Sequence, residues 1–126
     1  MLDVAFAERV RSCLLEMAPF VEKKMFGGLG FLVEGKMAVG VSSKGQLIVR
    51  VEQDETELLI QKAHVTPMRT SGRIARGWVL VDQEALSEDL VLDDWVERGV
   101  MFALRSAQIE QKRDLHRSEP TDTSGE

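Results

Sequence analysis

The strongest constraint on the fold is a strand-like alternation of apolar and polar residues. It occupies two runs, Lys36–Val41 and Gln46–Val51. Glu34-Gly35 before the first run suits a tight hairpin turn, and Ser42-Ser43-Lys44-Gly45 suits a longer turn between the runs. The pattern predicts that the two runs are neighbouring antiparallel strands. In the first strand, Met37, Val39 and Val41 share one face. In the second strand, Leu47, Val49 and Val51 share one face, and Gln46, Ile48 and Arg50 lie on the other.

A glycine-rich segment, Gly27-Gly28-Leu29-Gly30, precedes this pattern. Met25-Phe26 and Gly30–Val33 on either side of it have strand character, and we interpret them as one strand that bends at a glycine bulge or kink. Phosphate binding is the rival interpretation. The segment lacks a following Lys-Ser pair and leads into a strand, whereas phosphate-binding glycine loops lead into a helix N-terminus.

Amphipathic helices are predicted before, within and after the strands, and one more strand near residue 80. The first helix is predicted at Asp3–Ala18, with an apolar stripe of Val4, Ala7, Val10, Leu14 and Met17, and a second, shorter helix at Asp54–Lys62, with Leu58 and Leu59 facing the core. A loop or a short edge strand with a loop follows at Val65–Arg76, and a strand at Gly77–Val81. The last helix runs from Asp89 to Ala107 or beyond, with an apolar stripe of Leu92, Trp95, Val96, Gly99, Phe102 and Ala103.

This order, α-β-β-β-α-(β)-β-α, predicts an α+β two-layer sandwich in which helices pack on an antiparallel sheet of four to five strands. Residues 1–107 are expected to form the domain. Residues 108–126 form a polar extension, and we expect disorder in its last part, Arg117–Glu126, where Pro, Ser, Thr, Gly and acidic residues gather.

Composition points to a cytoplasmic protein. The 126 residues contain one cysteine, Cys13, which excludes an intrachain disulfide and fits a reducing compartment. No apolar run approaches the roughly 18 residues that a membrane span needs, and the first residues do not resemble a signal peptide. The formal net charge of −5 disfavours a protein that coats nucleic acid by bulk electrostatics.

No catalytic set is apparent in the sequence. Cys13 has no histidine near it and is interpreted as a small buried apolar residue. His64 and His116 lack cysteine or carboxylate partners at ligand spacing, so we predict no metal site. The acidic residues Asp89, Asp93 and Asp94 at a helix start match the helix dipole. We therefore expect no enzyme activity and no cofactor.

Two features remain as candidates for binding. Arg69, Arg73 and Arg76 precede Trp78 in a stretch without acidic residues, so they could contact phosphates or carboxylates of a partner. The simpler interpretation is a solvated loop whose arginines pair with the acidic last helix. The second feature is a strand, Trp78–Val81, that is apolar on both faces. Either it lies at the centre of the sheet with both of its faces covered by other elements, or a second copy of the chain packs on it.

The glycine segment and its surroundings resemble the TfoX N-terminal domain family. The matching pieces are Lys23–Val33, Gly35–Val41, Leu47–Val51, Pro67-Met68, Gly72-Arg73, Gly77-Trp78-Val79 and Trp95-Val96 with Gly99 and Phe102-Ala103. The resemblance implies an antiparallel sheet with helices, similar to a secretion-chaperone-like arrangement, and a role in transcriptional regulation of DNA uptake. Competence regulators join this domain to a C-terminal domain, whereas here a short polar extension follows the matching region, so we expect a stand-alone domain.

The leading hypothesis is a non-catalytic regulatory or adaptor domain that binds a protein partner, with a second copy of the chain as one candidate partner. A second hypothesis is direct nucleic-acid binding through the Arg69–Arg76 loop. A third is a small-molecule or enzymatic role that uses a pocket near Phe26, the glycines and Trp78.

Overall fold

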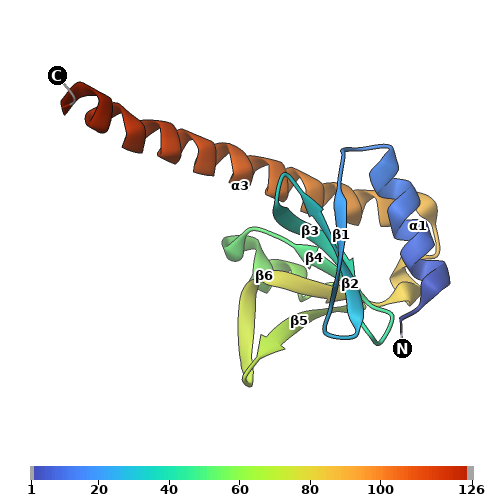
Figure 1. Cartoon of the computed structure of the whole chain (residues 1–126). Coiled ribbons are helices and arrows are strands. Elements are labelled where there is room, and N and C mark those ends of the chain that lie inside the picture. Colours follow the sequence, from blue (N-terminus) through green and yellow to red (C-terminus); the bar gives the residue numbers. More distant parts are fainter. Residues whose placement is uncertain (1, 125–126) are drawn as a thin grey trace.

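One antiparallel sheet with helices on one face makes up the protein (Figure 1). The computed structural model describes residues 2–124. The elements are α1 (Val4–Leu15), β1 (Val21–Met25), β2 (Gly28–Val33), β3 (Lys36–Val41), β4 (Leu47–Arg50), α2 (Thr56–Leu59), β5 (Val65–Thr70), β6 (Arg73–Val81) and α3 (Asp89–Ser124), with single 3-10 turns at Gln53–Glu55 and Gln83–Leu86. The strand order is β1-β2-β3-β4-β6-β5, and every pair is antiparallel. The α+β sandwich that the sequence predicts is confirmed.

Helix α1 begins as the sequence predicts. The Asp3 carboxylate accepts a hydrogen bond from the backbone N–H of Phe6 at 3.0 Å, which caps the helix N-terminus. The predicted stripe is correct at Ala7, Val10 and Leu14, but Val4 is 66% exposed and Phe6 is buried in its place. The buried face of α1 therefore begins at Phe6 and not at Val4.

The glycine segment is a hairpin turn, and the predicted single bent strand is wrong. Phe26 and Gly27 both have positive φ, 49° and 77°, as the two central residues of a tight turn between β1 and β2. Strand β1 therefore extends back to Val21 and pairs with β2 along its whole length. The sheet has six strands in the described residues, where the sequence predicts four to five.

The turn at Glu34-Gly35 and the strand Lys36–Val41 are confirmed, but the predicted faces of β3 are not. Phe31 pairs with Val39 and Leu32 pairs with Met37, so Ala38 is an extra residue on β3. Such a bulge reverses the alternation. Val39 consequently packs in the core, while the Met37 side chain lies on the opposite face, beside Gly40.

Segment 65–76 is a hairpin strand pair and not mainly a loop. Its turn is Ser71-Gly72, both at positive φ (52° and 80°). Strand β6 inserts between β4 and β5, so Trp78–Val81 is central in the sheet. The outer strands β1 and β5 carry Lys23-Lys24 and Pro67, which discourage further strand pairing at either edge.

Both long helices cover the same face of the sheet. A single core joins α1 and α3 to alternate residues of the strands, including the cross-strand pairs Leu47–Val81 and Val49–Val79. The intervening pairs, Ile48–Leu80 and Arg50–Trp78, belong to the other face. No element in the described part of the chain covers that second face, so strand β6 is central without being covered on both sides.

The second helix needs correction, whereas the last helix begins where the sequence predicts. In the second helix Leu59 is buried but Leu58 is 68% exposed, because the helix is only a four-residue turn, Thr56–Leu59. In α3 the last buried residue is Ala107, and residues 108–115 are exposed where the helix extends past the sheet (Figure 1). The backbone of α3 is helical to Ser124, and residues 125–126 lie outside the described part of the chain. The disorder expected from Arg117 onward stays a prediction.

Among the described residues, no helix combines the length and the apolar character that crossing a bilayer requires.

Replacing Gly99 should destabilise the fold, because α3 touches β3 there. A Cβ at Gly99 would lie 2.3 Å from the Ala38 carbonyl oxygen and 2.8 Å from a Val39 methyl. Alanine is the better helix former by about 1 kcal/mol, but a clash with backbone forces the two layers apart. We expect Gly99→Ala to lower the free energy of unfolding by about 1–3 kcal/mol in urea denaturation. Glu97→Ala, on the exposed side of α3, is the control and should change it by less than about 0.5 kcal/mol.

Candidate functional site

The open face of the sheet is hollowed into an apolar groove of about 630 Å³. All six strands contribute its walls, β1 through Met25, and the β1–β2 turn and the β3–β4 turn form its rim. The lining residues are Met25, Phe26, Leu29, Met37, Val41, Ser42, Ser43, Lys44, Gln46, Ile48, Met68, Arg69, Thr70, Trp78 and Leu80. This groove is the candidate functional site, because an uncovered apolar concavity on a sheet is where a ligand or partner gains most from leaving water.

Two paired glycines shape the groove at β2 and β3. Gly30 lies opposite Gly40 in the strand pairing. A Cβ at Gly30 would come within 2.8 Å of the Met25 methyl, and a Cβ at Gly40 within 2.7 Å of the Met37 methyl. The two methionine side chains therefore lie across backbone that has no side chains of its own. Unbranched thioether side chains on such a floor can change rotamer to fit what binds.

The rim carries an aromatic side chain that is almost fully in water. Phe26 is 96% exposed, at the turn between β1 and β2. Its φ of 49° is unusual for a bulky non-glycine residue. An exposed phenylalanine in a strained turn beside an apolar groove is better suited to a contact surface than to stability of the isolated chain.

A stacked arginine holds Trp78, one of the groove-lining side chains. The Arg50 guanidinium lies 4.8 Å from the ring centre of Trp78 and 4.4 Å from that of Phe102, and it donates to the Gly77 carbonyl at 2.7 Å. Burial lowers the pKa of Arg50, while the nearby Glu52 carboxylate opposes that shift. Gly77 has φ of 97° and leaves room for this guanidinium, since a Cβ there would lie 2.1 Å from Nη1 of Arg50. The position of Trp78 is thus set by a cation between two rings.

The four residues singled out from the sequence do not form one cluster. Arg69 and Trp78 line the groove, and Arg69 donates to the Gly72 carbonyl at 3.5 Å. Arg73 is exposed at the turn end of β6. Arg76 is drawn to α2, where its Nε lies 3.1 Å from the Glu57 carboxylate. The predicted pairing of these arginines with the last helix is wrong, because α3 packs on the opposite face of the sheet.

Sequence reasoning missed most of the apolar lining. It noted Ile48 as facing away from Val49 and suggested a pocket near Phe26 and Trp78, and the groove does lie there. It did not assign Met25, Met37 or Met68. The signal for Met37 was hidden by the bulge at Ala38, which changes the face without leaving a mark in the apolar–polar pattern.

Cys13 is not placed as a nucleophile. The half-buried thiol lies 3.0 Å from the Asp93 carboxylate, on the helix side of the sheet. Burial, and then the hydrogen bond and charge of Asp93, raise the pKa of Cys13 to about 12. The thiol form is therefore favoured, whereas nucleophilic cysteines are tuned in the opposite direction.

A model of the TfoX N-terminal domain family matches residues 13–103, from the end of α1 through all six strands into α3. A search of curated proteins gives no match, and a search of solved structures gives none either.

Arg50→Lys should destabilise the protein although it preserves the charge. A lysine cannot stack as a plane between Trp78 and Phe102, so we expect a loss of about 1 kcal/mol in the free energy of unfolding, measured by urea denaturation. Arg73→Lys, at an exposed position, is the matched control and should leave stability unchanged. Equal effects of the two substitutions would show that the stacking contributes nothing.

Cys13 should react slowly with a thiol reagent in the folded protein. A pKa raised from 9.0 to about 12 lowers the thiolate fraction at pH 8 by about a thousandfold. We expect modification by a disulfide reagent at pH 8 to be at least a hundredfold slower in buffer than in urea. Asp93→Asn should speed the reaction, since it removes a negative charge next to the thiol. Equally fast modification in both solvents would contradict this description of the site.

Proposed function

The chain belongs to the TfoX N-terminal domain family, and we propose that it is a non-catalytic regulatory module that binds an apolar segment of a protein partner in the groove of the open sheet face. The observation that carries the proposal is the groove itself, which has an apolar lining rich in methionine and an exposed phenylalanine at its rim. The family membership supports a regulatory role, and the proposal includes a cytoplasmic location.

The chemistry of the lining favours a peptide over a rigid small molecule. Met25, Met37 and Met68 supply adaptable contact area, as methionines do at surfaces that bind varied apolar segments. Phe26 could close over one end of a bound segment by a local change at its turn. Trp78, held by Arg50, offers a fixed aromatic anchor at the other end.

The charge around the groove selects the type of segment. Lys44 and Arg69 line it, and no carboxylate is among the lining residues. The protein as a whole carries a formal net charge of −5. A partner segment with apolar residues at its centre and acidic residues beside them would complement this local basic rim, whereas a basic segment would be repelled by Lys44 and Arg69.

Direct nucleic-acid binding has less support from the positions of the arginines. Arg76 is paired with Glu57, which leaves Arg69 and Arg73 for phosphates. A small apolar ligand is a stronger rival, since a groove of about 630 Å³ is within the usual size range of small-molecule sites. Both rivals are separate outcomes of the experiment below.

The test is selection of binding sequences from a random peptide library displayed on phage, followed by affinity measurement with the selected synthetic peptides. We expect sequences with apolar residues flanked by acidic ones. Phe26→Ala should weaken their binding about tenfold, since truncating an aromatic side chain that the partner buries costs about 1.4 kcal/mol at a contact that matters, about a factor of ten. Leu58→Ala, which removes another exposed apolar side chain, on α2, is the control and should leave the affinity unchanged.

Several results would reject the proposal. Selected peptides that lack apolar residues, or that bind the Phe26→Ala variant as well as the parent, would place the contact elsewhere. Binding of a labelled DNA duplex that weakens steeply with salt would favour the nucleic-acid hypothesis. If light scattering shows a dimer and the Phe26→Ala variant is a monomer, a second copy of the chain occupies the groove.

A further inference from the structure

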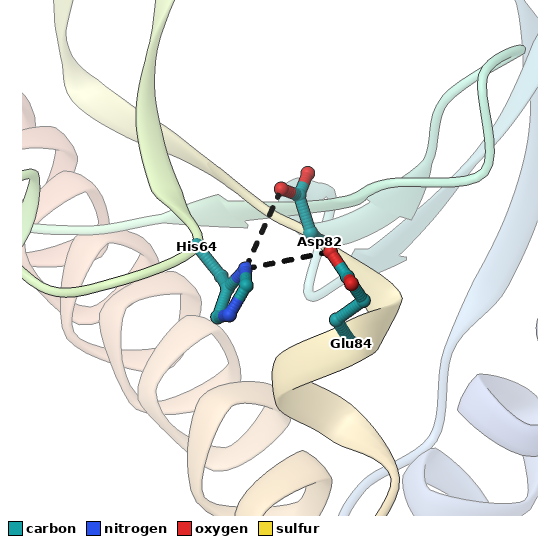
Figure 2. Close-up of side chains that lie close together, drawn as sticks. All are labelled: His64, Asp82 and Glu84. Atoms are coloured by element: carbon teal, nitrogen blue, oxygen red, sulfur yellow. Dashed lines mark ion pairs between the residues drawn. The ribbon is translucent and has the colours of Figure 1, made fainter.

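Three side chains with metal-binding atoms converge at the end of the β5–β6 pair that lies away from its turn. They are His64, Asp82 and Glu84, whose donor atoms all lie within 4.8 Å of one another (Figure 2). Figure 2 shows the imidazole directed at the two carboxylates. The sequence predicts no such site, because residues 64 and 82 are far apart along the chain.

The strand pairing brings the three residues together. Val65 pairs with Val81, so His64 and Asp82 flank the last paired residues of β5 and β6. The Asp82 backbone N–H donates to the His64 carbonyl at 3.0 Å, which closes this end of the ladder. Glu84 follows in the 3-10 turn Gln83–Leu86 and returns its side chain towards the imidazole.

Two local features orient the donor atoms. His64 has φ of 67°, a left-handed conformation in which histidine, asparagine and aspartate are enriched among non-glycine residues. The Gln46 side-chain amide donates to Oδ1 of Asp82 at 2.9 Å. That bond leaves Oδ2 of Asp82 to face Nδ1 of His64. An outer hydrogen bond of this kind is the usual support of a metal-binding carboxylate.

The separations suit an ion better than a direct contact. Nδ1 of His64 lies 3.6 Å from a Glu84 carboxylate oxygen and 4.0 Å from an Asp82 carboxylate oxygen. Nitrogen–oxygen hydrogen bonds are shorter, at about 2.7–3.2 Å. Two ligands at about 2.0–2.1 Å from a tetrahedral zinc ion are about 3.4 Å apart. The three atoms are thus close to the spacing of ligands around one ion and need only small side-chain adjustments.

We propose that His64, Asp82 and Glu84 bind a divalent transition-metal ion of the zinc type. One imidazole nitrogen and two carboxylate oxygens form a donor set that suits zinc and its first-row neighbours, while magnesium and calcium prefer oxygen alone. The side chains of His64 and Asp82 are 44% and 37% exposed, so water can complete the coordination. The bound ion links β5, β6 and the turn after β6, and it therefore stabilises the half of the sheet that bears Trp78.

The test is a calorimetric titration of the untagged chain with zinc chloride, together with thermal unfolding in the presence and absence of zinc. We expect one ion per chain and a rise in Tm of about 5 °C at saturating zinc. His64→Asn retains a residue that tolerates the left-handed backbone but removes the imidazole. This variant and Glu84→Gln should each weaken zinc binding at least tenfold, an effect of the size expected when a site of three protein ligands loses one.

Matched controls separate this site from incidental binding. His116→Asn removes the only other histidine of the chain, and Glu88→Gln removes a carboxylate close in sequence to Glu84; neither should change the zinc affinity. Magnesium chloride should give no heat at the same concentrations. The proposal is overturned if zinc gives no heat, or if His64→Asn binds zinc as tightly as the parent. It is also overturned if His116→Asn loses as much affinity as His64→Asn.

Discussion

The close approach of α3 to the sheet at Gly99 is the contact on which the rest of the structure depends. The helix backbone lies against the Ala38 carbonyl at a distance that leaves no room for a side chain. The same stretch of β3 carries the bulge at Ala38, so the strand bends where the helix crosses it. Leu92, Val96 and Ala103 of α3 then reach the core together with α1. Both long helices are consequently committed to one face.

That commitment leaves the other face of six strands without a helix, and the residues on it form neither a polar surface nor a flat apolar one. The paired glycines Gly30 and Gly40 remove side chains from its centre, and Met25 and Met37 lie over the gap. Trp78 and Leu80 remain half-buried there, at positions that a fully solvated sheet face would normally give to polar residues. The groove is therefore a consequence of one-sided packing combined with glycine at two paired positions.

Charge is arranged locally in a way that the net value conceals. The formal charge of −5 describes the whole surface, yet Lys44 and Arg69 are the charged residues that line the groove. Arg76 and Arg50 are engaged elsewhere, by Glu57 and by the rings of Trp78 and Phe102. The acidic residues Asp82 and Glu84 gather at His64, at the other end of β6. The proposed groove and the proposed metal site are neighbours, because Gln46 lines the groove and its side-chain amide donates to Asp82.

The sequence by itself determined the elements whose cause is local. The capped first helix, the turn at Glu34-Gly35 and the strand Lys36–Val41 follow from side-chain period and turn chemistry, and the family was identifiable from the glycine segment and its neighbours. The tertiary structure alone decided that β6 lies between β4 and β5, that Ala38 reverses the face of Met37, and that His64 meets Asp82 and Glu84. A bulge, a strand order and a ligand cluster depend on contacts between residues distant in the chain, and a local apolar–polar pattern has the same appearance whichever of those contacts forms.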